Sequence, residues 1–467
     1  MTVMSEDGYD IVILGGGSGG YACALRASEL GKRVALIEKD KVGGTCLHRG
    51  CIPTKALLHA AEIADQARAG AGFGVPTALG DIDGPALNAY KDTVVNQLWK
   101  GLTGLVASRK IDVIEGAGRL VSPTEIRVGD RLIRGEHLVL ATGAQPRTLP
   151  GLRVDGERVI TSEHALTLDR VPASAVILGG GVIGVEFASA WRSLGAEVTI
   201  VEALPRLLPD EEESSSRWLQ RAFKKRGIGF ELGARLEGVK ADGDGITATL
   251  EGGRTLAAQL LLVAVGRDPA SAGLGFEEAG VATEHGLVTV DEHCQTGVPT
   301  ISAVGDLTPG PQLAHVGFAQ GILTAEKIAG LPVTAIDYDG VPRITYSDPE
   351  VASVGLTSAT AAARGLETVE VRYPLGANAR SVILQTQGEA KVIAVAPADG
   401  DDQPGRVLGI HLVGARVGEL IAEAQLICNW KAAPAEVAQL IHPHPTQSEM
   451  IGETHLALAG KPLHFHG

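Results

Sequence analysis

The sequence contains little cysteine and no long apolar stretch. Five cysteines among 467 residues are too few for a disulfide scaffold, so in a reducing cytosol each is expected to be a buried thiol unless chemistry requires otherwise. The longest apolar runs, such as Leu260–Val265, are far shorter than the roughly 20 residues that a membrane-spanning helix needs. Met1–Asp10 is polar and acidic and lacks the features of a secretory leader. We therefore expect a cytoplasmic chain without membrane contact.

The chain also lacks an excess of positive charge. It carries 41 basic and 55 acidic residues, which gives a net charge of -14 at pH 7. Neither end holds a basic arm of the kind that neutralises phosphates. Nucleic acid is therefore not expected as a partner.

Glycine, in contrast, is abundant. The 61 glycines are 13% of the chain, against a usual share of about 7%. Because hydrophobic residues still make up 45%, the surplus indicates tight turns in a packed protein and not disorder. The length predicts about three domains.

The first forty residues predict a βαβ unit. Tyr9–Leu14 is a largely apolar run typical of a buried parallel strand, Tyr21–Leu30 has a helical pattern, and Arg33–Glu38 is again strand-like. Glycines lie at the turn between the first strand and the helix, with the spacing of a nucleotide-binding motif: Gly15, Gly17 and Gly20.

The same pattern returns 164 residues later. A strand is predicted at Ala175–Leu178, a helix at Val185–Leu194 and a second strand at Glu197–Glu202, and the turn again holds three glycines: Gly179, Gly181 and Gly184. Glu38 and Glu202 each lie 23 residues after the first glycine of their copy. Two copies in the same register predict two nucleotide sites.

The residue types in each copy fit a dinucleotide. The first glycine permits the tight turn, the second lets the backbone approach a pyrophosphate at the helix N-terminus, and the third lets helix and strand pack closely. The acid accepts a ribose hydroxyl and repels a 2′-phosphate, so both sites should favour unphosphorylated ribose. Arg206 lies four residues after Glu202 and would favour NADP if it faced the ribose, but a surface arginine is the simpler interpretation.

Turn residues divide the rest of the chain. Leu138–Gly143, Leu260–Gly266 and Ile301–Asp306 are each predicted as a strand ending in a turn, and Asp306 is suited to accept a hydrogen bond from a ligand hydroxyl. Breaks are predicted at Leu149–Gly151 and Pro269–Gly275. From Pro342 onward the sequence predicts an α+β domain whose strands include Thr368–Tyr373, Lys391–Val395 and Arg406–Val413.

Cys46 and Cys51 form a close pair just before a helical pattern that continues through Ala67. On a regular helix their Cα atoms would lie roughly 8.7 Å apart, beyond the roughly 7 Å that a disulfide can bridge. Gly50 and Pro53 are suited to distort the chain there, and a helix N-terminus stabilises a thiolate. A redox-active pair is therefore favoured over two buried thiols. Half of a zinc site is disfavoured because no second cysteine pair exists.

A second reactive group is predicted in Ile441–Met450, which holds His442, His444 and Glu449. A histidine oriented by a carboxylate can take the proton of a thiol substrate near neutral pH. Alternatively, Thr446 and Glu449 form a capping box that starts a helix, and the histidines are exposed loop residues. The two interpretations are compatible. We expect no metal site, because no carboxylate or cysteine clusters with these histidines and the tail histidines, His464 and His466.

The order of the motifs resembles that of the pyridine nucleotide-disulfide oxidoreductases, and within them most the members that oxidise dihydrolipoamide. The motifs are GGGSGG, GGTCLHRGCIPTK, ATG, GGGVIGVE, VGRDP, VGD and HPHPTQSE, and they extend over essentially the whole chain. The resemblance implies an α/β fold with two Rossmann-like dinucleotide-binding domains, a central domain and a C-terminal α+β dimerisation domain. The implied boundaries are 1–150 for FAD, 151–272 for NAD, 273–341 for the central domain and 342–467 for the interface domain.

The resemblance also implies roles for individual residues. Cys46 would exchange with the substrate, and Cys51 would lie next to the flavin. His444 would be the acid/base with Glu449 as its partner, both acting in the other subunit of a homodimer with shared active sites. Lys55 and Glu186 would form an ion pair beside the flavin.

Cofactor contacts follow from the same resemblance. The implied contacts of a tightly bound, non-covalent FAD are Gly15, Gly17, Gly20, Glu38, Lys55, Gly116, Thr142, Gly143, Asp306, Gln312, Leu313, Ala314 and His315. The implied contacts of NAD+ are Gly179, Gly181, Gly184, Glu186, Glu202 and Gly266. The implied partner is a lipoylated protein of a 2-oxo acid dehydrogenase complex or a glycine cleavage system.

Some residues depart from the family pattern. His48 and Arg49 lie between the two cysteines, where many members carry smaller or uncharged residues. The chain lacks the C-terminal cysteine pair of mercuric reductase, and Glu202 argues against the NADPH-using glutathione reductase type. The alternatives are an NAD(P)H-dependent reductase of another low-molecular-weight disulfide and a non-catalytic flavoprotein subunit.

Overall fold

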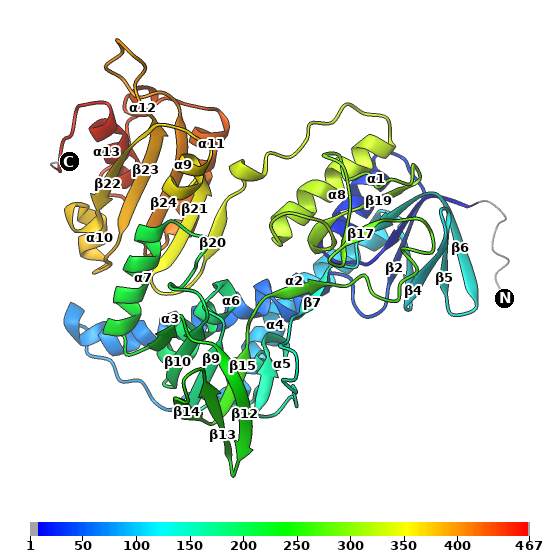
Figure 1. The fold of residues 1–467 in the computed structure, drawn as a ribbon, viewed down its shortest axis with the longest axis horizontal. Helices are drawn as coiled ribbons and strands as arrows, with labels where there is room; N and C mark the ends of the chain where they lie inside the picture. Colours follow the sequence, from blue (N-terminus) through cyan, green and yellow to red (C-terminus); the bar gives the residue numbers. More distant parts are fainter. Residues whose placement is uncertain (1–7, 466–467) are drawn as a thin grey trace. The chain divides into compact units, whose positions relative to one another are not determined.

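The computed structural model describes residues 8–465, which form two compact units (Figure 1). The first unit comprises Met1–Ala56, Pro85–Arg147 and Gly266–Tyr338, and the second comprises Leu57–Gly84, Thr148–Val265 and Asp339–Gly467. Residues 1–7, which are most of the stretch where a secretory leader would begin, lie outside the described residues. His466 of the tail lies outside them too. The chain passes between the units at 147–148 and 265–266, close to the predicted breaks. The four-domain division stays a prediction.

A parallel sheet is the core of the first unit. Its strands lie in the order β3, β2, β1, β6 and β19, with β1 and β19 both pairing with β6. No residue of β1 or β2 is exposed, as expected for strands covered on both faces. The bounds are β1 Tyr9–Leu14, β2 Val34–Glu38, β3 Asp112–Glu115, β6 Arg131–Leu140 and β19 Ile301–Ala303.

β6 is ten residues long and takes part in both parallel and antiparallel strand pairing. Its second half pairs in parallel with β1, from Gly135 opposite Tyr9 to Leu140 opposite Leu14. Its first half pairs antiparallel with β5, which pairs with β4. The remaining strands of the first unit are short: β4 Gly118–Ser122, β5 Glu125–Val128, β7 Ala144–Pro146, β16 Arg267–Pro269, β17 Thr283–Glu284 and β18 Leu287–Val288.

Two helices of the first unit pack unusually closely, α1 (Ser18–Glu29) and α8 (Ala314–Ile328). A Cβ atom on Gly321 of α8 would lie 2.3 Å from the carbonyl oxygen of Gly19 in α1. The helices can therefore approach this closely only because glycine occupies the contact. The other helices that contribute to this unit are α2 Gly44–Arg49, α3 Cys51–Ala69, which continues into the second unit, and α4 Gly84–Ser108.

The second unit contains another parallel sheet, with its strands in the order β11, β10, β9, β15 and β8. An antiparallel sheet of β12, β13 and β14 adjoins it in sequence. The strands are β8 Val159–Thr161, β9 Ser174–Leu178, β10 Glu197–Glu202, β11 Gly229–Leu232, β12 Leu236–Asp242, β13 Gly245–Leu250, β14 Thr255–Ala258 and β15 Leu260–Val263. The helices are α5 Ser162–Ala165, α6 Val182–Ser193 and α7 Glu213–Lys225. The repeated βαβ unit is thereby confirmed.

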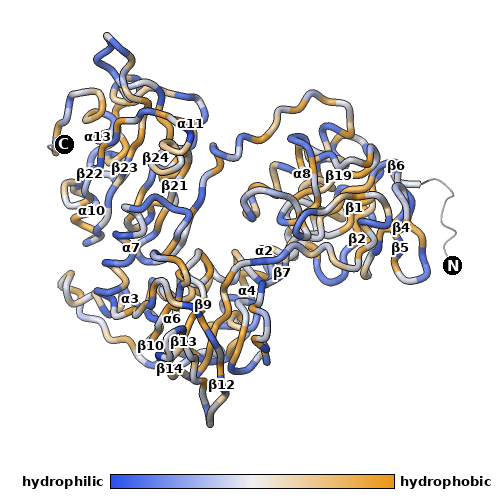
Figure 2. The backbone as a smooth tube through the Cα atoms, viewed as in Figure 1, coloured by the Kyte–Doolittle hydropathy of each residue, from blue (hydrophilic) through white to orange (hydrophobic). Residues whose placement is uncertain are grey.

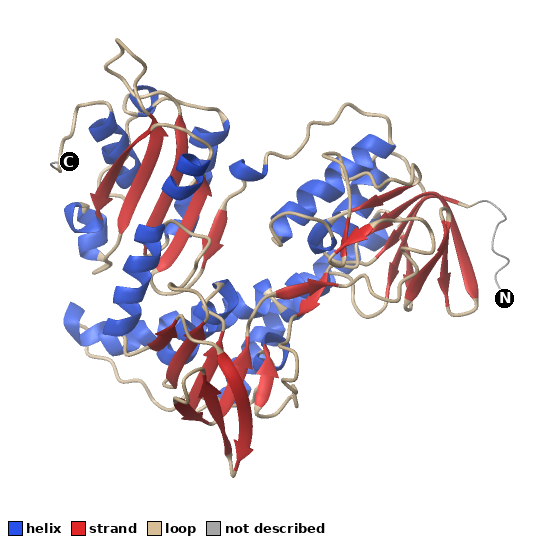
Figure 3. Ribbon diagram, viewed as in Figure 1, coloured by secondary structure: helices blue, strands red, loops and turns tan. Residues whose placement is uncertain are grey.

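The last 125 residues form an antiparallel sheet in the order β20, β21, β24, β23 and β22, flanked by helices (Figure 3). The three predicted strands are present, and two more precede them. β24 is buried along its whole length, and its trace is largely apolar (Figure 2). The bounds are β20 Arg343–Thr345, β21 Glu350–Gly355, β22 Thr368–Pro374, β23 Glu389–Val395, β24 Val407–Gly414, α9 Ser358–Ala363, α10 Ala379–Ile383, α11 Ile421–Asn429, α12 Pro434–Val437 and α13 Glu449–Leu458.

A buried ion pair joins α7 to this antiparallel sheet. The Lys391 ammonium on β23 lies 2.9 Å from Glu212, the residue before α7, and both side chains are almost completely buried. Burial alone would raise the pKa of Glu212, but the hydrogen bonds from Lys391 and the Ser358 amide lower it below its usual value. The Glu212 carboxylate is therefore charged inside the protein, where its charge depends on Lys391, which also lies 2.6 Å from Glu370.

Replacing Lys391 by methionine should strongly destabilise the second unit. The change leaves the Glu212 carboxylate buried without its cation, and we expect a loss of about 3–5 kcal/mol in the free energy of unfolding. Urea unfolding followed by circular dichroism, at one protein concentration, measures it. Arg254→Gln, which removes an exposed ion pair with Glu231, is the matched control and should cost about 1 kcal/mol or less. Equal losses in the two variants would contradict the prediction.

Candidate active site

The turn from β1 to α1, Gly15–Gly20, is here called the first cradle. A Cβ atom on Gly15 would lie 2.3 Å from the carbonyl oxygen of Ala141, and one on Gly20 would lie 1.9 Å from that of Gly15. A Cβ atom on Gly17 would meet nothing within 4 Å. The outer glycines are therefore required by the protein's own backbone, while the middle one borders open space at the N-terminus of α1.

The second cradle, Gly179–Gly184 between β9 and α6, repeats this geometry. A Cβ atom on Gly179 would lie 2.3 Å from the carbonyl oxygen of Ala264, and one on Gly184 would lie 1.9 Å from that of Gly179. Again, a Cβ atom on the middle glycine, Gly181, would meet nothing within 4 Å. The two sites predicted from the repeat are therefore built in the same way.

Each cradle holds the carboxylate of its predicted ribose-binding acid. Glu38 accepts hydrogen bonds from the amides of Gly16 (2.7 Å) and Asp40 (2.9 Å), one on each oxygen. These bonds fix the direction of the side chain while each oxygen keeps capacity for another donor. Glu202 does the same, with the amides of the second cradle and of the loop after β10 as donors, Gly180 (2.6 Å) and Leu204 (2.7 Å).

Both cradles fit a dinucleotide. The N-caps of α1 and α6 are Gly17 and Gly181, and neither helix has a side-chain cap or an acidic residue in its first turn. The first backbone N–H groups are therefore left for an anion, which the helix dipole also favours. With the acid oriented toward the ribose position, each cradle has the donors and acceptors that an adenosine diphosphate group requires.

Arg206 is not the freely exposed arginine that the sequence suggested. It is half-buried, and its Nη2 atom donates to the carbonyl oxygens of Pro209 (2.5 Å) and Glu211 (3.2 Å). Its guanidinium group therefore holds its own loop together and is not poised for a 2′-phosphate. This arrangement agrees with a site for unphosphorylated ribose.

Further residues expected near the flavin gather in the first unit. The Thr142 hydroxyl donates to the carbonyl oxygen of Ala270 (2.7 Å), and the Ala270 amide donates to that of Gly143 (2.8 Å). These bonds join the two crossing segments beside the first cradle. The Gly116 amide, at a φ of 138°, donates to the carbonyl oxygen of Glu38. Burial raises the pKa of Asp306, and the charge of Arg267 partly offsets this rise.

The remaining expected contacts lie at two turns. The Gln312 amide approaches the carbonyl oxygen of Asp306 at 3.4 Å, and the N-terminus of α8 follows at once. Leu313 is the N-cap of that helix, and Ala314 and His315 are its first residues. Gly266, expected to contact NAD, has a φ of 113° and lies where the chain re-enters the first unit.

The two cysteines lie on separate helices. α2 ends at Arg49 and α3 begins at Cys51, with Gly50 between them in a non-helical conformation. The predicted interruption of the helix is confirmed. The thiols of Cys46 and Cys51 share a hydrogen bond, which, together with burial, raises the pKa of Cys46 well above its usual value. This hydrogen bond brings the two thiols into direct contact.

Charged and phenolic groups surround this pair. The Lys55 ammonium, one turn along α3 from Cys51, partly offsets the rise in the pKa of Cys46. Burial, with the nearby thiols, raises the pKa of Tyr21 to about 12, so its phenol stays protonated. No motif in the sequence marked Tyr21, which follows the third glycine of the first cradle. The only signal was its place directly after that glycine, in the first turn of α1.

The structure explains the unusual residues between the cysteines. The His48 Nε2 atom lies 3.0 Å from the carbonyl oxygen of Val42, and the imidazole ring packs edge-on against Trp99. Arg49 forms an ion pair with Asp40. Since the Asp40 amide also binds Glu38, these contacts connect the turn between the two cysteines to the Glu38 carboxylate.

His444 and Glu449 form the predicted dyad within the second unit. The His444 Nδ1 atom lies 2.8 Å from one oxygen of Glu449, whose other oxygen accepts from the Thr446 amide at 2.8 Å. The imidazole is mostly exposed, while the carboxylate is largely covered. Burial alone would raise the pKa of Glu449, but the Thr446 amide and the His444 ring together lower it. An exposed base on a fixed anion is the arrangement that acid/base chemistry needs.

The predicted capping box is only half present. The Glu449 side chain does bind the Thr446 amide, but α13 begins at Glu449 with Ser448 as its N-cap, and the Thr446 hydroxyl donates to the carbonyl oxygen of Pro443. Thr446 therefore stabilises the turn that carries His444 and does not cap the helix. This turn brings the His444 imidazole back to the Glu449 carboxylate.

His442 is not the exposed loop residue of the alternative interpretation. Its Nε2 atom lies 2.7 Å from the Glu423 carboxylate, and this hydrogen bond raises the pKa of His442. The ring packs against Gly452, where a Cβ atom would lie 2.5 Å from Nδ1. His442 thus anchors the loop, while the His444 ring stays exposed. Glu423 lies 19 residues away, and nothing in the sequence pointed to it.

Glu186 lies on α6 just after the second cradle and is buried. Its carboxylate accepts a hydrogen bond from the Tyr346 amide at 2.9 Å. Lys55, its expected partner, belongs to the first unit, so that ion pair stays a prediction.

Other classes of site are not seen in the part of the chain that the structure describes. Within residues 8–465, no group of three or more histidine, cysteine, aspartate or glutamate side chains is arranged for a metal ion. His464 instead pairs with Glu453 at 2.8 Å. No helix over the same range is long and apolar enough to cross a bilayer.

Comparison with known families covers most of the chain. Residues 9–321 match the pyridine nucleotide-disulphide oxidoreductase family, and residues 341–455 match the dimerisation domain of that family. The second match supports a homodimer.

Several characterised proteins are similar over nearly their full length. A dihydrolipoyl dehydrogenase of Bacillus subtilis is 41% identical, covering 98% of this chain and 99% of its own. The mitochondrial dihydrolipoyl dehydrogenase of Pisum sativum is 38% identical, covering 98% and 93%. A leghemoglobin reductase of Vigna unguiculata is also 38% identical, covering 99% and 89%.

Solved structures show the same fold. LpdA from Mycobacterium tuberculosis has a TM-score of 0.89 at 29% identity, covering 96% of this chain and 99% of its own. The HOCl-induced flavoprotein disulfide reductase RclA from Escherichia coli has a TM-score of 0.85 at 30% identity, with the same coverage. The chain is therefore an oxidoreductase that uses FAD and NAD(H), and it belongs to the pyridine nucleotide-disulphide oxidoreductase family.

Proposed function

We propose that this protein is a dihydrolipoyl dehydrogenase, which oxidises the dihydrolipoyl group of a lipoylated protein and reduces NAD+ to NADH. The observation that carries the proposal is the hydrogen-bonded pair of Cys46 and Cys51 at a helix start beside the first cradle. The similarity to dihydrolipoyl dehydrogenases over 98% of the chain supports it. The four predicted domains, the FAD contacts in the first unit and the NAD contacts around the second cradle are part of the proposal.

The thiol chemistry is an exchange of disulfides. One thiolate of dihydrolipoamide attacks the Cys46 sulfur, which breaks the Cys46–Cys51 bond and leaves Cys51 as the thiolate. The second substrate thiolate then attacks the mixed disulfide, releases Cys46 and closes the lipoamide ring. Two electrons have passed from the substrate to the cysteine pair. When bound, FAD and NAD+ supply the hydride chemistry that returns the pair to the disulfide.

His444 handles the protons of this exchange. A thiol must lose its proton to attack, and the imidazole, fixed through Nδ1 by Glu449, can accept that proton at Nε2. The carboxylate stabilises the imidazolium that results. In the proposed homodimer the dyad of one subunit serves the cysteine pair of the other, so each active site is shared.

The nucleotide preference follows from the second cradle. The carboxylate of Glu202 accepts from two backbone amides and would repel a 2′-phosphate, while Arg206 is engaged within its own loop. We therefore propose NAD+ as the acceptor, with Lys55 and Glu186 as an ion pair beside the flavin. The partner is a lipoylated protein of a 2-oxo acid dehydrogenase complex or a glycine cleavage system, in the cytoplasm.

A steady-state assay tests the function directly. The FAD-loaded protein is offered dihydrolipoamide with NAD+ and, separately, with NADP+, and the nicotinamide absorbance is followed between pH 6 and pH 9, roughly the range that brackets histidine titration. We expect NADH formation and little NADPH. Absence of NADH formation, together with turnover of another low-molecular-weight disulfide at the expense of NADPH, would instead favour the reductase alternative. RclA, an HOCl-induced disulfide reductase, shares this fold.

Cys46→Ser should abolish the reaction with dihydrolipoamide. A hydroxyl cannot form the mixed disulfide, so we expect a loss of at least about 10³-fold in kcat. Cys428→Ala, a thiol on α11 outside the active site, is the control and should keep wild-type activity. Unchanged turnover in Cys46→Ser, with FAD retained, would refute the enzymatic role and favour a non-catalytic flavoprotein.

Glu449→Gln should move the pH profile and lower its maximum. Because the pKa of Glu449 is lowered, the wild-type carboxylate is charged throughout the assay range and stabilises the imidazolium. Without that charge, His444 loses its proton more readily, so the acid limb of kcat should move to lower pH, with kcat reduced by about 10- to 100-fold. Glu453→Gln, on the same helix and paired with His464, is the control. An unmoved acid limb in Glu449→Gln would contradict the role of the dyad.

Gly181→Ala and Gly184→Ala should impair the protein in different ways, the first by weakening NAD+ binding and the second by lowering stability. An added methyl at Gly181 meets no protein atom but enters the space proposed for the NAD+ phosphates, so we expect about a tenfold higher KM for NAD+ and an unchanged melting temperature. At Gly184 the methyl would lie 1.9 Å from the carbonyl oxygen of Gly179, so the second unit should be destabilised. The KM and the melting temperature are measured for both variants. Identical behaviour would contradict this assignment of the cradle.

A further inference from the structure

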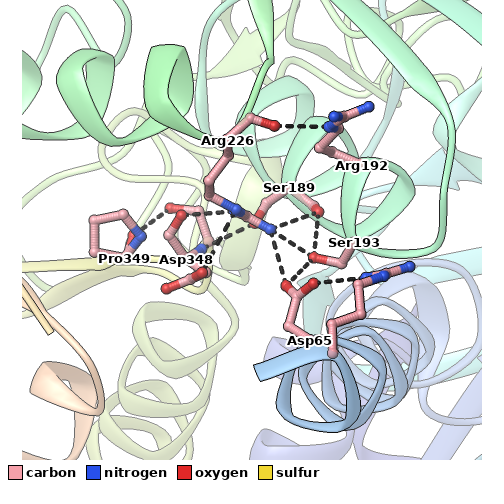
Figure 4. Close-up of polar contacts among 9 residues, drawn as sticks. Asp65, Ser189, Arg192, Ser193, Arg226, Asp348 and Pro349 are labelled. Carbon is pink, nitrogen blue, oxygen red and sulfur yellow. Dashed lines mark hydrogen bonds and ion pairs between the residues drawn. The ribbon is translucent and has the colours of Figure 1, made fainter. Parts of the chain in front are cut away.

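Arg226 is the residue directly after α7, and its side chain is largely buried among three separate segments of the second unit (Figure 4). The Nη1 atom donates to the carbonyl oxygen of Asp348 (2.7 Å) and to the hydroxyl of Ser189 (2.9 Å). The Nη2 atom donates to the hydroxyl of Ser193 (2.5 Å) and to the carboxylate of Asp65 (3.1 Å). A guanidinium group is suited to this because its donors are rigidly spread in one plane.

The first of these segments is α6, the helix that follows the second cradle. Ser189 and Ser193 lie one turn apart on one of its faces, and both are almost completely buried. Glu186 lies three residues before Ser189 on the same helix. Fixing the two serines therefore fixes the helix whose N-terminus forms the proposed NAD+ site.

The second segment is the far part of α3, the helix that begins at Cys51. Asp65 lies 14 residues after Cys51, so about 21 Å along the helix axis. Its carboxylate accepts from Arg226 and from the Ser193 hydroxyl, the latter at 2.5 Å. Arg226 thus joins the far part of α3 to α6, the helix that follows the second cradle.

The third segment is the loop between β20 and β21. Besides the bond from Arg226 to its carbonyl oxygen, the Asp348 amide donates to the Ser189 hydroxyl at 2.9 Å. Two residues earlier, the Tyr346 amide donates to the carboxylate of Glu186. The orientation of Glu186 is therefore tied to the position of this loop, and the loop is tied to Arg226.

The proposed mechanism does not use Arg226, yet its contacts converge on α6 and on the loop whose Tyr346 amide binds Glu186. Its own carbonyl oxygen accepts from the Arg192 Nε atom at 2.7 Å, which secures the backbone as well. Without the guanidinium, the hydroxyls of Ser189 and Ser193 on α6 would each lose one hydrogen-bond donor, and Asp65 would lose one of its two neighbouring cations, the other being the more exposed Arg68. Hydrogen bonds lost by buried groups cost free energy, so the segments would shift to recover partners.

We propose that Arg226 is a positioning residue for the exchange of electrons with NAD(H). It locks α6, α3 and the 346–349 loop into one arrangement and thereby sets the placement of Glu186 and of the second cradle. The inference rests on the proposed function in so far as it takes the second cradle as the NAD+ site. It does not require dihydrolipoamide to be the substrate.

The two half-reactions separate this role from general stability. Anaerobic stopped-flow absorbance follows reduction of the FAD-loaded enzyme by NADH and, separately, by dihydrolipoamide. In Arg226→Gln we expect reduction by NADH to slow by at least about tenfold, since small displacements of reacting groups carry a large rate penalty. Reduction by dihydrolipoamide should stay within about twofold of the wild type. Arg226→Lys, which keeps the charge but not the planar fork, should fall between the two.

Arg217→Gln is the matched control, because Arg217 lies on α7, which Arg226 directly follows, and its ion pair with Glu213 is exposed. It should change neither half-reaction. Equal slowing of both half-reactions by Arg226→Gln, or no slowing with NADH, would overturn the proposal. If Arg226→Gln does not fold, Ser189→Ala and Asp65→Asn each remove one contact and should show the same asymmetry at smaller size; a symmetric effect there also overturns it.

The outcomes distinguish this inference from the proposed function. If the wild type does not react with dihydrolipoamide, the proposed function fails, while the NADH half-reaction still tests Arg226. If the wild type turns over dihydrolipoamide with NAD+ and Arg226→Gln reacts with NADH at the wild-type rate, the function stands and the inference falls.

Discussion

The close contact between the third glycine and the carbonyl oxygen of the first is the constraint on which both nucleotide sites depend. In each cradle this contact leaves no room for a side chain, at Gly20 and again at Gly184. It presses the start of the helix onto the end of the strand, which directs the free N–H groups of the helix toward one point. The acid at the end of the next strand is then within reach of the same point. Removing this contact would displace every other feature of the site.

The carboxylates beside the two cradles and in the His444 dyad are oriented by the same kind of contact. Glu38, Glu202 and Glu449 each accept a hydrogen bond from a backbone amide that lies outside their own element. Such a bond fixes the orientation of the side chain and stabilises its charge, without using a cation that would neutralise it. The carboxylate therefore reaches its partner, a ribose hydroxyl or an imidazole, already oriented. Preorganisation of this kind lowers the cost of binding and of proton transfer.

The chemistry is divided between the two units. The thiols and the first cradle belong to the first unit, and the second cradle and the His444 dyad belong to the second. Within the second unit, the buried ion pair of Lys391 with Glu212 joins the start of α7 to the antiparallel sheet. The segment with the His444 dyad and the segment with the second cradle are thus parts of one unit. Arg226 joins the far part of α3 to α6 within that unit.

The sequence by itself determined the two cradles, the interrupted helix at the cysteine pair and the His444–Glu449 dyad. Each depends on the backbone geometry of a few consecutive residues, and glycine or proline at a set spacing is enough to specify it. Tertiary structure alone decided that His442 is bound by Glu423, that Arg206 is engaged by its own loop and that Arg226 bridges three segments. Those contacts join residues far apart in the chain or side chains with several possible directions. No local pattern encodes them, because only packing selects which partner a long side chain meets.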